Sequence, residues 1–241
     1  MRLSGKLPSM AGFVGLSLML SGCVDLYGDA TPYLGEVEER IALTMPANAP
    51  SIRQQYRVED PNSENAAPYK HEGIDVIAKL GTPVLAAAPG RVTKSFVEPM
   101  YGNQVVIDHG ADASGRRTIS IYKHLDRKSV KVGDTVARGQ AIGTLGRTGV
   151  LAAGILHLHF EIHRQVKPGG RGLIPIDPNR LWMNGVGKIT CFDGAVEYDE
   201  TVFRATYPVV CKGLNPAAVT FPHGTGSLSA LKRPTPETAT E

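Results

Sequence analysis

Four residues, His71, Asp75, His157 and His159, have the types and the spacing of a metal site. Zinc accepts nitrogen from histidine and oxygen from aspartate, and a catalytic zinc is held by three protein ligands that leave a fourth position for water or substrate. His71, Asp75 and one histidine of the pair would fill those three positions. The sequence therefore predicts a site for one zinc ion, and it has further histidines that are not needed as ligands.

The segment from residue 157 to 163 predicts how the histidine pair is presented. It alternates polar with apolar residues, in the order His157, Leu158, His159, Phe160, Glu161, Ile162 and His163. In a β-strand the polar set would share one face and the apolar set would face the core, so two imidazoles could converge on one site. The helical HExxH motif is excluded at the other end of the site, because Gly73 disfavours a helix and the residue four after His71 is an aspartate.

The segments that join these motifs resemble the lysostaphin-type (LytM-domain) zinc endopeptidases of the bacterial cell wall. The resemblance covers roughly residues 70–180 and lies in five stretches in the same order: HEGIDVIAKLGTPVLAAAPGRV, YGNQVVIDHG, IYKHL, VKVGDTVARGQAIGTLGRTG and HLHFEI. It implies zinc ligation by His71, Asp75 and His159, and catalytic roles for His124 and His157. It also implies hydrolysis of peptide cross-links or stem peptides of peptidoglycan. Which of the two catalytic histidines is the base stays open.

Two other functions remain as alternatives. A non-catalytic member of the same fold could activate a cell-wall amidase by protein contact, but such members have usually lost ligands and this chain has all five expected residues. A lipoyl-type carrier or phosphotransfer module is suggested by VKVGDTVARGQAIG, but a carrier needs an exposed lysine at a hairpin tip and does not need the histidine motifs. His109, His163 and His223 are assigned no chemistry.

The middle of the chain predicts a mainly β fold. Short β-type runs bounded by Gly, Pro, Asn and Asp fall at residues 82–88, 90–97, 103–110, 117–124 and 141–146. The resemblance implies an antiparallel sandwich or barrel, the duplicated hybrid motif, with zinc on the floor of a groove. One departure from the family is VLAAGIL before the histidine pair, where Leu151, Ile155 and Leu156 make the approach to the site apolar.

The N-terminus predicts an exported lipoprotein. Arg2 and Lys6 precede an apolar run from residue 11 to 20, which is too short to cross a bilayer, and then LSGC, which matches the bacterial lipobox. Cleavage before Cys23 and acylation of its sulfur would anchor the protein. Because Val24 follows Cys23, an outer-membrane anchor that faces the periplasm is favoured; an ordinary signal peptide is the alternative.

The remaining chain divides into a tether, a catalytic domain and a C-terminal part. Loss of residues 1–22 removes Arg2 and Lys6 and lowers the formal net charge from +3 to +1, which gives no reason to expect nucleic-acid binding. In an oxidising compartment, Cys191 and Cys211 are the available disulfide pair. The predicted parts are a signal peptide (1–22), a tether (23–50), an endopeptidase domain (51–182), an appendage with the cysteines (183–215) and a disordered tail (216–241).

Overall fold

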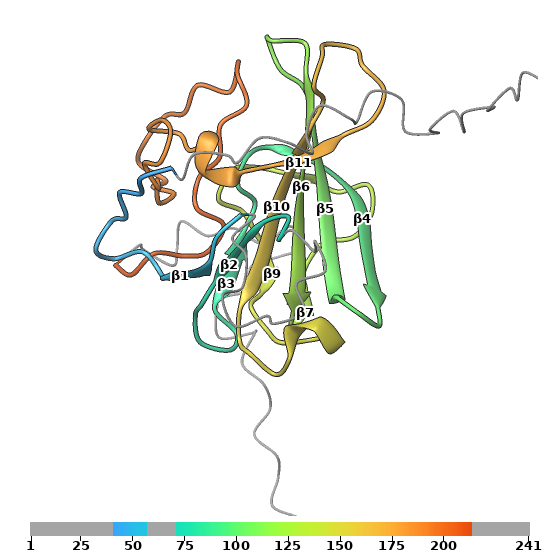
Figure 1. Ribbon diagram of the computed structural model, residues 1–241, viewed down its shortest axis with the longest axis vertical. Helices are drawn as coiled ribbons and strands as arrows, with labels where there is room; N and C mark the ends of the chain where they lie inside the picture. The colour runs from blue at the N-terminus through green and yellow to red at the C-terminus, as the bar shows by residue number, and fades with distance from the viewer. Residues whose placement is uncertain (1–40, 57–70, 214–241) are drawn as a thin grey trace, which may run out of the picture. The chain divides into compact units, whose positions relative to one another are not determined.

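The computed structural model describes residues 41–56 and 71–213, and the fold within them is mainly β, as predicted (Figure 1). The predicted signal peptide, Cys23, most of the tether and the predicted tail lie outside these residues. No helix in the described ranges is long and apolar enough to cross a membrane. The elements are β1 (Ile52–Gln54), β2 (Ile74–Val76), β3 (Pro83–Leu85), β4 (Gly90–Glu98), β5 (Gly102–Ala111), β6 (Arg117–Leu125), β7 (Arg127–Lys128), β8 (Thr135–Val136), β9 (Ala141–Thr144), β10 (Leu158–Arg164), β11 (Ile174–Ile176) and the 3-10 turns η2 (Val150–Ala152) and η3 (Pro178–Arg180).

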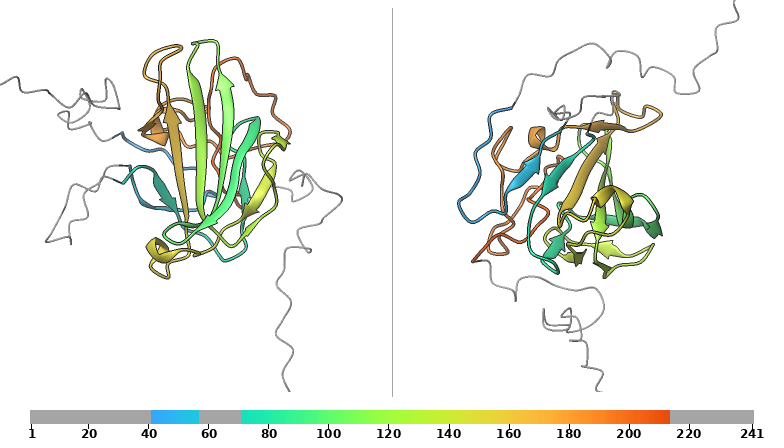
Figure 2. Two further views of the ribbon diagram at one scale, coloured as in Figure 1. Left: turned by 90° about the vertical axis from the view of Figure 1, so that its right-hand side faces the viewer. Right: turned by 60° about the horizontal axis from the view of Figure 1, so that its bottom comes forward.

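The strands form two antiparallel sheets. The larger has eight strands in the order β1-β2-β10-β6-β5-β4-β8, with β11 on β10, and the smaller has the order β3-β9-β7. Figure 2 (left) shows β10, β6, β5 and β4 side by side. In the order of the larger sheet, the histidine-rich strand β10 lies between β2 and β6. The two sheets are compatible with the predicted sandwich, whereas the described strands close no barrel.

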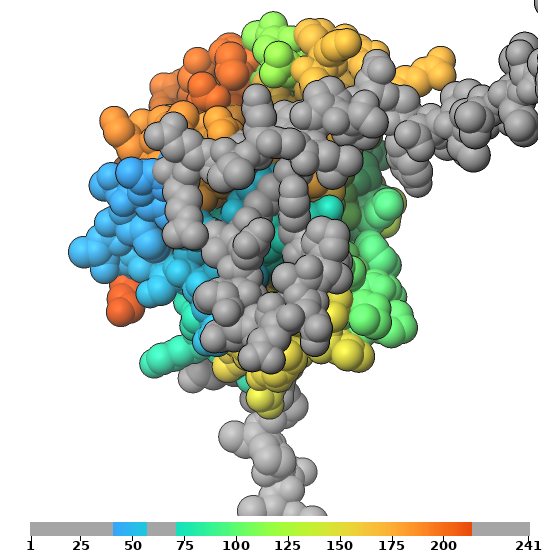
Figure 3. All heavy atoms as spheres, in the orientation of Figure 1, coloured from blue at the N-terminus to red at the C-terminus, as the bar shows by residue number. Residues whose placement is uncertain are grey.

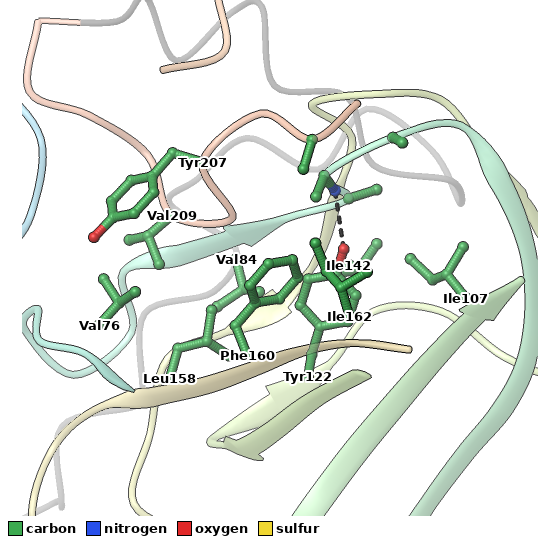
Figure 4. Packing of buried hydrophobic residues seen from close by; sticks show 14 of the residues in the cluster. Val76, Val84, Ile107, Tyr122, Ile142, Leu158, Phe160, Ile162, Tyr207 and Val209 are labelled. Atoms are coloured by element: carbon green, nitrogen blue, oxygen red, sulfur yellow. Dashed lines mark hydrogen bonds between the residues drawn. The ribbon is translucent and has the colours of Figure 1, made fainter. Parts of the chain in front are cut away.

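The core lies on one face of the larger sheet, against the smaller sheet. On β10, Leu158, Phe160 and Ile162 are fully buried, as the alternation of residue types predicts. They pack in one cluster with Tyr122 of β6 and with residues of β3 and β9 (Figure 4). Because successive side chains point to opposite faces, burial of this apolar set turns the histidines of β10 onto the other face.

The predicted strands are confirmed where the chain pairs regularly and are shorter elsewhere. Those predicted at 90–97, 103–110 and 117–124 are β4, β5 and β6, with ends within one residue. The run predicted at 82–88 forms a strand only over β3, and beyond it the Ala87 N–H donates to the Tyr122 hydroxyl at 2.9 Å (Figure 4).

The C-terminal appendage contributes to the same core. Among the described residues 183–213 it has turns and isolated bridges but no named strand. Its Tyr207 and Val209 are buried in the main cluster with Trp182, so the core continues across the predicted boundary at residue 182. The segment that follows residue 41 lies beside it (Figure 1): Thr44 bridges Lys188, which places the end of the predicted tether against the appendage.

Cys191 and Cys211 form the predicted disulfide, with 6.0 Å between their Cα atoms. Replacing both cysteines by serine is expected to lower the free energy of unfolding by about 3 kcal/mol, because the bridge closes a loop of 20 residues. Chemical denaturation of the wild type and the variant measures this difference. Zinc content under native conditions should not change, since neither cysteine lines the site. Free thiols at both positions in exported protein would contradict the pairing.

Candidate metal centre

The predicted ligands His71, Asp75 and His159 converge because β2 and β10 are neighbours. Asp75 on β2 is the direct antiparallel partner of His159 on β10, and His71 lies in the turn that enters β2. This turn runs close against β10: a Cβ on Gly73 would lie 2.3 Å from the Phe160 carbonyl oxygen. A glycine between the two ligands of HEGID therefore permits the approach.

Three ligand atoms, one from each residue, form a tight triangle. His71 Nε2 lies 3.2 Å from Asp75 Oδ1 and 3.0 Å from His159 Nδ1, and His159 Nδ1 lies 2.9 Å from Asp75 Oδ1. Ligands at about 2.0–2.1 Å from a tetrahedral zinc are separated by roughly 3.3 Å, close to this spacing. The three residues are also buried. They thus have the donor set and the spacing to hold one zinc ion.

The outer nitrogen of each histidine ligand is fixed by an acceptor. His71 Nδ1 lies 2.8 Å from the Gln55 carbonyl oxygen, and His159 Nε2 lies 2.8 Å from Oε1 of Glu161. Because a carbonyl or an ionised carboxylate can only accept, these nitrogens carry the protons and donate them. The unprotonated nitrogens, His71 Nε2 and His159 Nδ1, then point at Asp75. Three acceptors packed this closely require a proton or a cation between them, which supports a metal site.

The electrostatics of the triangle favour an ionised aspartate. Burial alone would raise the pKa of Asp75, but its contacts with the His159 and His71 imidazoles hold this pKa well below its ordinary value. Burial alone would lower the pKa of His159, but its contacts with Asp75 and Glu161 raise it. At neutral pH the site therefore offers a carboxylate, the form that binds a metal ion.

His124 reaches the site through an irregularity in β6. The register between β5 and β6 shifts between Asn103 and Val105, and His124 has a positive φ of 63°. Such a bulge bends the strand and re-aims a side chain. His124 Nδ1 donates to the Thr148 carbonyl oxygen at 2.8 Å. The proton on Nδ1 leaves Nε2 as the basic nitrogen.

His157 stands beside His124 and outside the ligand triangle. Their ring centroids are 4.7 Å apart, and His157 Nε2 lies 3.8 Å from Asp75 Oδ1, farther than the ligand atoms. His157 Nδ1 donates to the Ile155 carbonyl oxygen at 3.1 Å, so its Nε2 is also the basic nitrogen. Burial lowers the pKa of His124 to about 4, and burial likewise lowers the pKa of His157. Both imidazoles are therefore neutral at pH 7 and able to accept a proton.

All five predicted site residues line one pocket. It is bordered further by Gln54, Glu72, Tyr101, Leu151 and Glu161. Leu151 belongs to the apolar VLAAGIL segment, whose turn η2 adjoins the tip of the β4–β5 hairpin (Figure 3). Leu151 N donates a hydrogen bond to Met100 O there. Leu151 is 45% exposed and Met100 is 44% exposed. Of the three residues of the predicted apolar approach, Leu151 lines the pocket, whereas Leu156 packs against the core and Ile155 is not a lining residue.

The other described histidines have structural surroundings. His109 bridges the Pro89 carbonyl oxygen and the Ser120 hydroxyl, and burial lowers its pKa to about 4. His163 contacts Glu161 on the same strand face. His223 lies outside the described residues. Glu161 lies on the predicted polar face of β10 but was not predicted as a site residue, and neither were Lys123 and Tyr101. For Glu161, a polar side chain two positions from a ligand on the same strand was the available signal.

The sequence from residue 69 to 171 matches the model of Peptidase family M23, and this range contains all five site residues. Residues 69–171 are a Peptidase family M23 domain. One M23 relative, peptidoglycan DD-endopeptidase ShyC from Vibrio cholerae, is 44% identical over 91 residues, which are 38% of this chain and 19% of ShyC. The lipoprotein NlpD/LppB homolog of Pseudomonas aeruginosa is 39% identical over 99 residues, which are 41% of this chain and 31% of that protein.

Among solved structures, LytU is 31% identical with a TM-score of 0.42, over 54% of this chain and 83% of LytU. The chain spans about a fifth of the length of the first curated M23 relatives. The M23 match over residues 69–171 and the converging ligand triangle argue against the carrier-domain alternative.

Proposed function

We propose that this protein is a zinc-dependent endopeptidase that hydrolyses peptide cross-links or stem peptides of peptidoglycan. The observation that carries the proposal is the triangle of His71 Nε2, Asp75 Oδ1 and His159 Nδ1, with His124 and His157 beside it in one pocket. M23 peptidases depend on zinc, and several of the relatives are peptidoglycan DD-endopeptidases. These names support peptidoglycan as the substrate.

Each of the five predicted site residues has a role in this reaction. His71, Asp75 and His159 would hold the zinc, which when bound polarises a carbonyl group and makes water more acidic. His124 and His157 each present an unprotonated Nε2, and an imidazole can accept a proton and return it. The hydrogen bonds of their Nδ1 atoms to main-chain oxygens orient both rings. One histidine can thus take a proton from the attacking water at Nε2, and the other can stabilise developing negative charge once its own Nε2 carries a proton.

Digestion of purified sacculi tests the proposal. Protein that lacks the predicted signal peptide should release soluble muropeptides, and mass spectrometry should identify the peptide bond that is cut. Activity should disappear with a chelator and return with zinc. Intact sacculi together with stimulation of a cell-wall amidase would favour the non-catalytic alternative, which the complete set of five residues argues against.

We also propose that Cys23 anchors the protein in the outer membrane, facing the periplasm. The sequence LSGC after a charged and then apolar N-terminus supports this. Cys23→Ala is expected to abolish lipidation and to move the protein from the membrane to the soluble fraction, because acyl chains supply the membrane affinity. Fractionation after a salt wash measures it. A variant that still pellets with membranes would show that the protein is not a lipoprotein.

A further inference from the structure

A buried ion pair, Lys123–Glu161, lies behind the ligand His159, and the proposed reaction gives it no role. Lys123 on β6 is the direct antiparallel partner of His159 on β10, and Glu161 lies two residues further along β10. Residues in these positions project from the same face of a sheet. Lys123 Nζ donates a hydrogen bond to Oε1 of Glu161, and the two residues are only 8% and 1% exposed.

The carboxylate of Glu161 is fixed by donors on both oxygens. Oε1 accepts from His159 Nε2 at 2.8 Å as well as from Lys123, and Oε2 accepts from His163 Nε2 at 2.8 Å. Lys123 is itself held, since its Nζ lies 3.9 Å from the centroid of the Tyr101 ring, a cation–π contact. A continuous set of contacts therefore runs from the pocket wall at Tyr101 to the outer nitrogen of a metal ligand.

We propose that Lys123 and Glu161 are positioning residues for His159, an inference that rests on the proposed zinc site. Glu161 accepts the Nε2 proton of His159 and so keeps the Nδ1 lone pair directed at the metal position. Lys123 acts one step further out, because its hydrogen bond holds the carboxylate where His159 can reach it. Outer partners of metal-bound histidines typically contribute about 10- to 100-fold in metal affinity or activity.

A purely structural role explains this pair less well. Removing two charges from water is costly, and replacement of a buried ion pair by neutral groups of similar size is often neutral or stabilising. Stability alone therefore gives little reason to bury a lysine and a glutamate at this position. The need to orient His159, which contacts Glu161, does give a reason to bury this pair.

The test is a double-mutant cycle with zinc affinity as its readout. The dissociation constant for zinc is measured by competition with a chromophoric chelator for the wild type, Lys123→Met, Glu161→Gln and the double variant. We expect Glu161→Gln to weaken binding by about 10- to 100-fold. Lys123→Met should weaken it by a smaller factor, and it should add nothing in the Glu161→Gln background, because Lys123 acts only through Glu161. Lys94→Met, which removes a lysine from an exposed position on β4, is the matched control and should bind zinc like the wild type.

Thermal unfolding of the zinc-free proteins separates positioning from stability. If Lys123→Met lowers the melting temperature but leaves the zinc dissociation constant unchanged, the pair is structural and the proposal is wrong. An equal effect of Lys123→Met in both backgrounds would also overturn it. The double variant leaves no unpaired buried charge, so it remains informative if a single variant does not fold: wild-type zinc affinity in the folded double variant contradicts the proposal. A wild type that binds no zinc would overturn the proposed function together with this inference, whereas the other outcomes overturn this inference alone.

Discussion

Replacement of His71, Asp75 or His159 by alanine is expected to abolish zinc binding and peptidoglycan hydrolysis together. Each residue supplies one corner of a triangle whose sides are 2.9–3.2 Å. Loss of one ligand leaves two, and it should lower zinc affinity by more than the roughly 10- to 100-fold that is typical when an outer partner of a ligand is lost. Zinc content after dialysis and the rate of muropeptide release, measured on the same preparations, check this prediction.

Asp75→Asn sharpens the experiment because it keeps the shape of the side chain and removes its charge. Its matched control is Glu197→Gln, which makes the same chemical change at an exposed position in the appendage. The control should keep zinc and activity, and Asp75→Asn should lose both. Full zinc content in His159→Ala, combined with its loss in His157→Ala, would show that the two histidines of the pair have been assigned in reverse. Wild-type activity in all three ligand variants would mean that the protein is no zinc endopeptidase.

Strand β10, which begins at Leu158 directly after His157, could be predicted from sequence because its two faces differ chemically. Leu158, Phe160 and Ile162 are fully buried, so the intervening residues must face the other way. The residue types alone do not decide which histidine joins Asp75. That depends on the register between β2 and β10, where His159 is opposite Asp75. Register between strands that are 84 residues apart in the chain is a property of the whole sheet, and here only the resemblance to the family indicated the choice.

Two features of the site lay beyond pattern analysis for different reasons. The bulge that turns His124 into the pocket depends on a positive φ, which histidine adopts more often than most residues but which no local motif marks. The Lys123–Glu161 pair joins two strands whose pairing has to be known first. Similarly, the sequence shows that Cys191 and Cys211 can pair, but not that the segment between them completes the core around Trp182.

Loss of either neighbouring histidine should separate metal binding from turnover. His124→Asn and His157→Ala are expected to keep zinc and to lower kcat by about 10²- to 10⁴-fold, the usual contribution of a general acid or base. His157 Nε2 lies 3.8 Å from Asp75 Oδ1, outside the triangle of ligand atoms, so its loss removes no ligand. Asparagine is chosen at position 124 because it tolerates positive φ, so the bulge can persist without the imidazole. Zinc content and the rate on sacculi are measured for each variant.

The double variant shows whether the two histidines act in one step. If one takes the proton of the attacking water while the other stabilises the charge that this transfer creates, their roles depend on each other, and the combined loss should be smaller than the product of the two single losses. The 4.7 Å between the His124 and His157 ring centroids makes such coupling expected. Losses that multiply exactly would place the histidines in independent steps. A single variant that keeps both zinc and full turnover would remove that histidine from the reaction and leave an acid–base role to the other histidine.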